Sequence, residues 1–96
     1  MLTGKQKRYL RDLASKEKAL FQVGKDGLGE NLFLTVRQAL DARELVKVSV
    51  LKSCPHEMNE VMIEIAAATG SEIVQKIGRS IVFYKPSREK KIVLPK

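Results

Sequence analysis

The segment Gly24–Gly27, which reads Gly-Lys-Asp-Gly, holds the residue types of this sequence that are best suited to chemistry. Glycine lets a backbone approach a phosphate closely and tolerates positive φ angles, and Lys25 supplies a mobile cation. An apolar run at 20–23 precedes the segment and a helical pattern follows it, so unpaired amides at the positive end of a helix dipole would lie beside it. Asp26 is a poor neighbour for phosphate and is better suited to support the turn or to cap the helix. The segment therefore favours contact with a phosphodiester backbone, as in the Gly-x-x-Gly loops of K homology domains.

The same segment also fits an ordinary strand-to-helix turn, because two glycines three residues apart are common in turns. It lacks the Gly-Lys-Ser/Thr ending of a mononucleotide P-loop, and no acidic ribose partner is placed for a dinucleotide fold. A small phosphate-handling enzyme would need a general base and usually metal ligands, for which Asp26 and Glu30 are the only nearby carboxylates. The loop alone favours the plain turn, whereas the basic charge elsewhere in the chain favours phosphate binding.

The basic residues gather at the two ends of the chain. The 96 residues include 18 Lys+Arg and 11 Asp+Glu, which gives a net charge of +7. Residues 1–18 carry +4 and residues 76–96 carry +6, whereas the middle, 19–75, carries −3. A phosphate-binding face would result if folding brings the two ends together, with Lys25 bridging them. Besides the glycine segment, the candidate contacts of this face are Lys5, Lys7, Arg8, Arg11, Arg79, Lys85, Arg88, Lys90 and Lys91.

The spacing of apolar residues predicts three helices, over about 4–15, over about 29–43, and from residue 53 or 54 to Gly70. Thr3 followed three residues later by Gln6 is a capping box that opens the first helix. Ser53 or Cys54 caps the third helix, with Pro55 in its first turn, where a missing N–H costs little. The glycine at its end is a good C-terminal stop.

Four strands are predicted, at 20–23, 45–52, 72–77 and 79–85, and Gly78 indicates a hairpin between the last two. Val46, Val48 and Val50 alternate with Lys47 and Ser49, which is typical of a half-buried strand. The order α-β-α-β-α-β-β predicts an α/β (α+β) fold of two layers with a four-stranded mixed sheet. The crossover helices should pack on the same face of this sheet and connect neighbouring parallel strands.

Metal and nucleophile chemistry find little support in the chain. His56 is the only histidine, and nothing at ligand spacing completes a zinc site around His56 and Cys54. We assign His56 to the first turn of the third helix and expect no catalytic residue, cofactor or metal. A single cysteine indicates a reducing compartment, which we take to be the cytoplasm. No apolar run reaches the roughly 18 residues of a membrane span.

Several motifs together resemble a known family. They are the order of helices and strands, the loop Val23–Leu28, the Gly70…Gly78 spacing, the closing Val82–Pro86 stretch, and the terminal 88–95 segment. In this combination they resemble the CRM domain and, more closely, its stand-alone bacterial form, the YhbY family. The resemblance covers essentially all 96 residues. It implies a single domain, 1–96, with a basic C-terminal tail at 86–96.

The resemblance further implies an RNA-binding module whose fold is similar to the C-terminal domain of the third bacterial translation initiation factor. Bacterial members are associated with precursors of the large ribosomal subunit, and plant organellar members take part in intron splicing. By position, Gly24, Lys25, Asp26 and Gly27 would be the family's RNA-contact loop. Plant domains tend to continue the last strand as Leu-Tyr-Arg-Gly, so a role for that Arg carries over here only as the charge of Lys85, and Pro86 stands in the glycine position.

We therefore expect a non-enzymatic, monomeric protein that binds RNA in the cytoplasm, with no membrane and no small-molecule substrate as partner. The expected RNA is ribosomal RNA within precursors of the large subunit, and the expected role is assistance in ribosome assembly. An alternative is a ribosome-associated module held mainly by protein contacts. DNA binding is disfavoured because no helix-turn-helix or zinc finger is visible.

Overall fold

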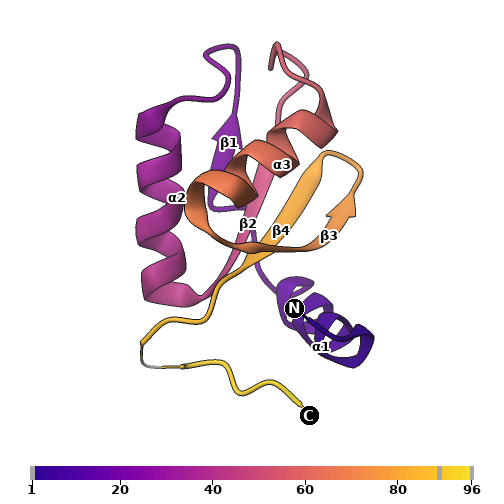
Figure 1. Ribbon diagram of the computed structural model, residues 1–96. Helices are drawn as coiled ribbons and strands as arrows, with labels where there is room; N and C mark the ends of the chain where they lie inside the picture. Colours follow the sequence, from indigo (N-terminus) through magenta and orange to yellow (C-terminus); the bar gives the residue numbers. More distant parts are fainter. Residues whose placement is uncertain (1, 89, 96) are drawn as a thin grey trace.

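Four strands form one mixed sheet, and three helices pack on it (Figure 1). The computed structural model describes residues 2–88 and 90–95. This architecture confirms the predicted fold class and the order of the elements. The elements are α1 (Gly4–Ala14), β1 (Phe21–Val23), α2 (Glu30–Arg43), β2 (Leu45–Val50), α3 (Met58–Thr69), β3 (Glu72–Ile77) and β4 (Ser80–Tyr84).

The strands lie in the order β1-β2-β4-β3. β1 and β2 are parallel neighbours, as predicted for a crossover through α2. β2 and β3 also run in the same direction, but β4 lies between them and is antiparallel to both. The predicted crossover between neighbouring strands is therefore wrong for β2 and β3. The physical reason is the composition of β4, whose Ile81–Tyr84 stretch is buried throughout and suits a central strand covered on both faces.

The two faces of the sheet bury different clusters of side chains. α2 and α3 cover one face, where Val46, Val48 and Val50 of β2 point inward, which confirms the predicted alternation and the shared face of these helices. α1 covers the opposite face together with the C-terminal tail, of which the structure describes residues 86–88 and 90–95. There Leu10 and Ala14 of α1 join a second cluster with residues of β2, β3 and β4. The protein thus has helices on both sides of its sheet, so the predicted arrangement of two layers is wrong. α1 adds a third layer because its Leu10 and Ala14 are buried against the second face.

α1 begins at the predicted capping box. The Gln6 amide donates to Thr3 Oγ1 at 3.1 Å, and the Thr3 amide donates to Gln6 Oε1 at 3.0 Å. Each side chain thereby satisfies an amide that would otherwise lack a partner at the start of the helix. This exchange fixes the position at which α1 starts.

Replacing Thr3 by alanine should lower the free energy of unfolding by about 1 kcal/mol, because the Gln6 amide loses its acceptor. Urea denaturation followed by circular dichroism measures this loss. Thr3→Ser keeps the hydroxyl and is the matched control, for which stability should be close to that of the unchanged protein. Equal losses for both variants would show that the capping bond contributes nothing.

The start of α3 differs from the prediction. The helix begins at Met58 with Glu57 as its N-cap residue, and neither Ser53 nor Cys54 caps it. Residues 51–57 form a separate loop instead, in which the Cys54 amide donates to Leu51 O at 3.0 Å. A proline in the first turn of a helix is tolerated, so Pro55 alone does not exclude the predicted start. Residues 51–57 lie outside the helix because they form this turn and pack, through Pro55 and His56, against Gly27. At the other end of α3, the left-handed Gly70 (φ 68°) confirms the predicted C-terminal stop.

Candidate nucleic-acid interface

Residues 24–29, which we term the glycine loop, join β1 to α2. The Gly27 amide donates to Gly24 O at 2.9 Å, which closes a tight turn with Lys25 and Asp26 exposed at its tip. Gly27 has a φ of +66°, a conformation that glycine adopts without steric cost. Among the described residues, no hydrogen bond or ion pair holds the Lys25 ammonium. The turn therefore presents a cation and exposed backbone to the solvent.

The beginning of α2 is open next to this turn. Gly29 is the N-cap residue, and no side chain accepts a hydrogen bond from the first amides of the helix. The suggestion that Asp26 caps α2 is therefore wrong, because the N-cap position is occupied by Gly29, three residues later, which has no side chain to accept a hydrogen bond. Uncapped amides at a helix N-terminus attract anions, although Glu30 in the first turn adds one negative charge there.

The loop 51–57 packs against the glycine loop. A Cβ atom added to Gly27 would lie 2.7 Å from His56 Nε2 and 3.2 Å from Pro55 Cγ. His56 is thus outside the first turn of α3, where the sequence placed it, and its Nδ1 is hydrogen-bonded to the Glu60 carboxylate. The assignment of His56 to the helix is wrong, because His56 and Pro55 pack against Gly27 in the loop that precedes Met58. Its imidazole instead restricts which residue can follow Asp26.

The turn between β3 and β4 reaches the same end of the sheet. Arg79 donates from Nε to Val50 O at 2.7 Å and from its guanidinium to Leu51 O at 2.8 Å. The Leu51 amide in turn donates to Val23 O, the last residue of β1. We call this region, residues 24–29, 51–57 and 78–79, the loop end of the sheet; the loops after β1 and β2 lie at the top of Figure 1.

Three cations belong to the loop end, one from each of its segments: Lys25, Lys52 and Arg79. Lys25 and Arg79 were predicted from the sequence, whereas Lys52 was missed. A signal for Lys52 exists, because it follows β2 as Lys25 follows β1. Parallel strands end at the same edge of a sheet, where ligands of α/β proteins commonly bind.

α1 and the C-terminal tail, which belong to the two basic ends of the chain, meet at the opposite end of the sheet. Gln6 of α1 donates from Nε2 to Pro95 O of the tail at 3.1 Å. The second cluster, to which α1 contributes Leu10, includes Leu45 and its partner Tyr84. Leu45 begins β2 and lies five residues before Val50, where β2 ends at the loop end. At about 3.3 Å per residue, this offset is about 17 Å. α1 and the tail are therefore brought together away from the glycine loop, so Lys25 does not bridge them. Arg79, which also belongs to the basic segment 76–96, lies at the loop end instead.

The predicted cations at this second end differ in their surroundings. Lys85 Nζ would lie 3.9 Å from a Cβ added to Gly70, at the C-terminus of α3, and Lys91 Nζ donates to Ala42 O near the end of α2 at 2.8 Å. Both charges thereby face the negative poles of helix dipoles. By contrast, most of the other predicted cations have exposed side chains: Lys5, Arg8, Arg11, Arg88 and Lys90, with Lys7 half-buried.

Within residues 2–88 and 90–95, no three histidine, cysteine, aspartate or glutamate side chains lie close enough together to hold a metal ion. In the same part of the chain, no helix has the length and apolar character to cross a membrane.

Comparison with known proteins identifies the family. Residues 2–85 match the model of the CRS1 / YhbY (CRM) domain, which is most of the chain. The chain belongs to the CRM family. Two bacterial relatives cover almost all of it: the "Probable RNA-binding protein YqeI" of Bacillus subtilis is 49% identical over 99% of this chain and 100% of its own length. An "RNA-binding protein" of Haemophilus influenzae is 35% identical over 99% of this chain and 96% of its own length.

A solved structure supports the CRM fold. The solution structure of the Staphylococcus aureus protein SAV1595 has a TM-score of 0.82 and 48% identity to this chain, over 99% of this chain and 100% of its own. The similarity to these relatives extends through the C-terminal tail, whereas the CRM family model ends at residue 85. The tail thus follows the matched domain directly.

Proposed function

We propose that this CRM protein binds ribosomal RNA in precursors of the large ribosomal subunit and assists their assembly, as a non-enzymatic monomer in the cytoplasm. The observation that carries the proposal is the glycine loop, an open turn with an exposed Lys25 beside the uncapped start of α2. Backbone amides and a mobile lysine contact phosphates without reading bases, which suits recognition of RNA by backbone and shape. The names of the bacterial relatives give RNA as their ligand.

The proposal assigns the first contact with RNA to the loop end. There Lys25 follows β1, and Lys52 follows the neighbouring parallel strand β2. Arg79 adds charge there, although two carbonyl oxygens already hold its guanidinium. Because such contacts release counterions, affinity should fall with increasing salt. The logarithm of the binding constant should decrease by roughly 0.7 to 0.9 per tenfold increase in salt for each neutralised phosphate. An affinity for large-subunit RNA that does not change between low and moderate salt would contradict the proposal.

Replacing Lys25 by glutamate should weaken binding to a large-subunit rRNA transcript about tenfold or more, because a charge-assisted contact to phosphate is replaced by repulsion. The variant should also cosediment less with ribosomal precursor particles. Filter binding and gradient sedimentation measure the two effects. The free energy of unfolding should change by less than about 0.5 kcal/mol, because the Lys25 side chain is exposed.

Lys18→Glu is the matched control, because it makes the same change in net charge at an exposed lysine outside the loop end. This control should lose much less affinity than the Lys25 variant. If both variants bind alike, the glycine loop is only a turn. If cosedimentation survives RNase treatment and also the Lys25 change, protein contacts rather than RNA hold the molecule on the particle.

A further inference from the structure

Glu44 is a fully buried acidic residue outside the loop end. It follows α2 as the C-cap residue, with a φ of +67°, and its exposed fraction is 0%. Glutamate is almost never buried to this degree unless its charge is paired or hydrogen-bonded, and residues other than glycine hold a positive φ only where their surroundings enforce it. Both features indicate that Glu44 has a defined partner.

That partner is the C-terminal tail. Glu44 Oε2 accepts hydrogen bonds from the Ser87 amide and the Ser87 hydroxyl, both at 2.7 Å, and Oε1 accepts one from the Ile92 amide at 2.6 Å. The Glu44 carbonyl oxygen also accepts from the Lys85 amide at 2.9 Å. The described part of the tail has no helix or strand of its own, so these bonds take the place of the ladder or helix bonds that its amides lack.

The buried carboxyl group of Glu44 remains ionised. Burial acts to raise the pKa of its carboxyl, but the hydrogen bonds from the tail outweigh burial and hold the pKa below its ordinary value of 4.5. The neighbouring Tyr84 has a raised pKa, because of its own burial and the negative charge of Glu44. The stability that these hydrogen bonds contribute is therefore fully present above pH 4.5. It is lost only as the pH falls through the lowered pKa of the Glu44 carboxyl in the folded protein.

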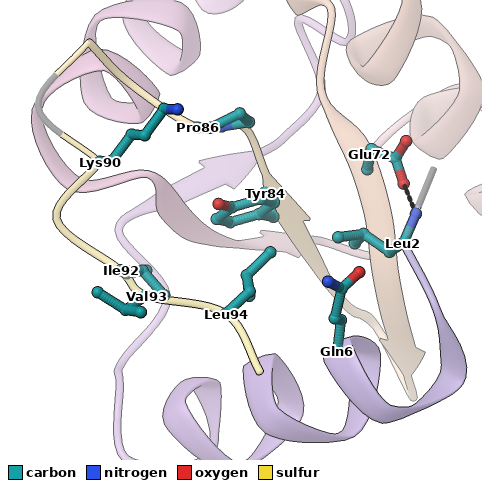
Figure 2. A pocket seen from close by; sticks show the side chains of 9 residues that line it. All are labelled: Leu2, Gln6, Glu72, Tyr84, Pro86, Lys90, Ile92, Val93 and Leu94. Carbon is teal, nitrogen blue, oxygen red and sulfur yellow. Dashed lines mark hydrogen bonds between the residues drawn. The ribbon is translucent and has the colours of Figure 1, made fainter. Parts of the chain in front are cut away.

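Beyond Glu44 the tail passes across the second face of the sheet and reaches α1. Figure 2 shows Tyr84 among Pro86, Ile92 and Leu94 of the tail, with Leu2, which precedes α1, and Gln6 of α1 on its other side. Ile92 and Leu94 pack against the cluster that contains Leu10 and Tyr84. The tail is thus fixed at Ser87, at Ile92 and at its bond with Gln6. Arg88 and Lys90, between the first two points, remain exposed.

We propose that Glu44 anchors the basic tail beside α1, and that the anchored tail and α1 together form a second RNA-contact surface at the end of the sheet opposite the glycine loop. This inference rests on the proposed function for its ligand, the phosphate backbone of RNA. Lys5, Arg8, Arg88 and Lys90 supply exposed cations there. The anchor removes most of the conformational freedom of the tail before binding, so that less is lost when RNA is bound. Glu44 is a positioning residue that does not touch RNA itself.

The anchor is tested first without RNA, by amide hydrogen exchange at neutral pH. In Glu44→Gln, one carboxylate oxygen becomes an NH2 group that cannot accept a hydrogen bond, so either Ser87 or Ile92 loses its acceptor. Exchange at one or both of the Ser87 and Ile92 amides should accelerate tenfold or more, while the Val48 amide in β2 remains protected. Unchanged exchange at both tail amides in the folded variant would overturn the anchor.

Ser87→Ala is the milder variant and keeps the test decisive if Glu44→Gln does not fold. It removes the hydroxyl donor to the carboxylate, keeps the Ser87 and Ile92 amides as donors, and leaves α2 intact. Exchange at Ile92 should then accelerate about threefold. No acceleration in this variant, measured beside an unchanged Val48, would equally overturn the anchor.

The surface is tested with the same large-subunit transcript used for the glycine loop. Arg88→Gln combined with Lys90→Gln should weaken binding threefold to tenfold and reduce the salt slope by roughly 0.7 to 0.9 for each phosphate that is no longer neutralised. In the Glu44→Gln background the same pair of changes should cost less than twofold, because the tail is no longer held in place. Lys16→Gln with Lys18→Gln is the control of equal charge.

The outcomes separate the two proposals. If the Lys25 variant loses binding but the Arg88 and Lys90 changes have no effect, the second surface is overturned and the glycine loop stands. If the unchanged protein does not bind the transcript, the proposed function fails and with it the second surface, while the exchange data still decide whether Glu44 anchors the tail.

Discussion

Replacing Gly27 by valine is expected to abolish most RNA binding and to destabilise the protein. A β-branched residue is a genuine outlier at the φ of +66° found here, and its Cβ would collide with the His56 ring and crowd Pro55. The left-handed backbone alone costs about 1–2 kcal/mol for a residue with a Cβ. The collision is relieved only if the His56 ring rotates and gives up its hydrogen bond to Glu60, or if the turn moves away from loop 51–57. We expect RNA affinity to fall more than tenfold, measured by filter binding beside urea denaturation.

Gly24 offers the matched control for the fold. A Cβ added there would lie 3.5 Å from Leu51, which is ordinary van der Waals contact, and its φ is not positive. Gly24→Ala should therefore change the free energy of unfolding by less than about 0.5 kcal/mol. If Gly27→Val proves as stable as Gly24→Ala, the left-handed turn is not required.

A second variant separates the two causes at Gly27. Gly27→Ala combined with His56→Ala removes the imidazole that lies 2.7 Å from the added Cβ but leaves the positive φ. Stability should recover in part, relative to Gly27→Ala alone. Full recovery would assign the whole loss to the collision, and no recovery would assign it to the backbone.

Replacing Leu10 by alanine is expected to give the largest loss of stability on the second face of the sheet. Leu10 is 0% exposed and lies in the cluster that joins α1 to β2, β3 and β4. Truncation of a buried leucine costs about 2–5 kcal/mol, out of the roughly 5–15 kcal/mol that holds a small domain folded. Thermal unfolding should therefore shift by about 10 °C or more.

Tyr9 on the same helix is the control for this change. It is 39% exposed, so Tyr9→Ala should cost much less while changing helix propensity in a similar way. Comparable losses for the two variants would contradict the docking of α1 through Leu10. Because the glycine loop packs against loop 51–57 and not against α1, the part of RNA binding that depends on Lys25 should persist in Leu10→Ala.

The parts of the fold that the sequence predicted correctly depend on short-range rules. The capping box of Thr3 and Gln6, the valine alternation of β2 and the left-handed Gly70 each involve residues a few positions apart, so a single stretch of sequence contains the whole signal. The position of β4 between β2 and β3 depends instead on which strand carries apolar side chains on both of its faces, as β4 does at Ile81–Tyr84. That comparison involves the whole sheet.

The candidate site shows the same division. The tight turn at Gly24–Gly27 could be predicted from its residues, whereas the packing of His56 against Gly27 depends on two loops that follow different strands. Glu44 carried no signal at all, because a glutamate at the end of an amphipathic helix normally faces solvent. Its burial results from the return of the chain more than forty residues later, at Ser87 and Ile92.

The hydrogen bond between Gln6 and Pro95 has a consequence for longer proteins. It holds the beginning and the end of the described chain together, and in Figure 1 both lie at the bottom, away from the loops after β1 and β2. Chain ends that lie close together allow a domain to be inserted into a host protein or joined in tandem through short linkers. Copies connected in this way could be arrayed side by side with every glycine loop on the outer edge of the array.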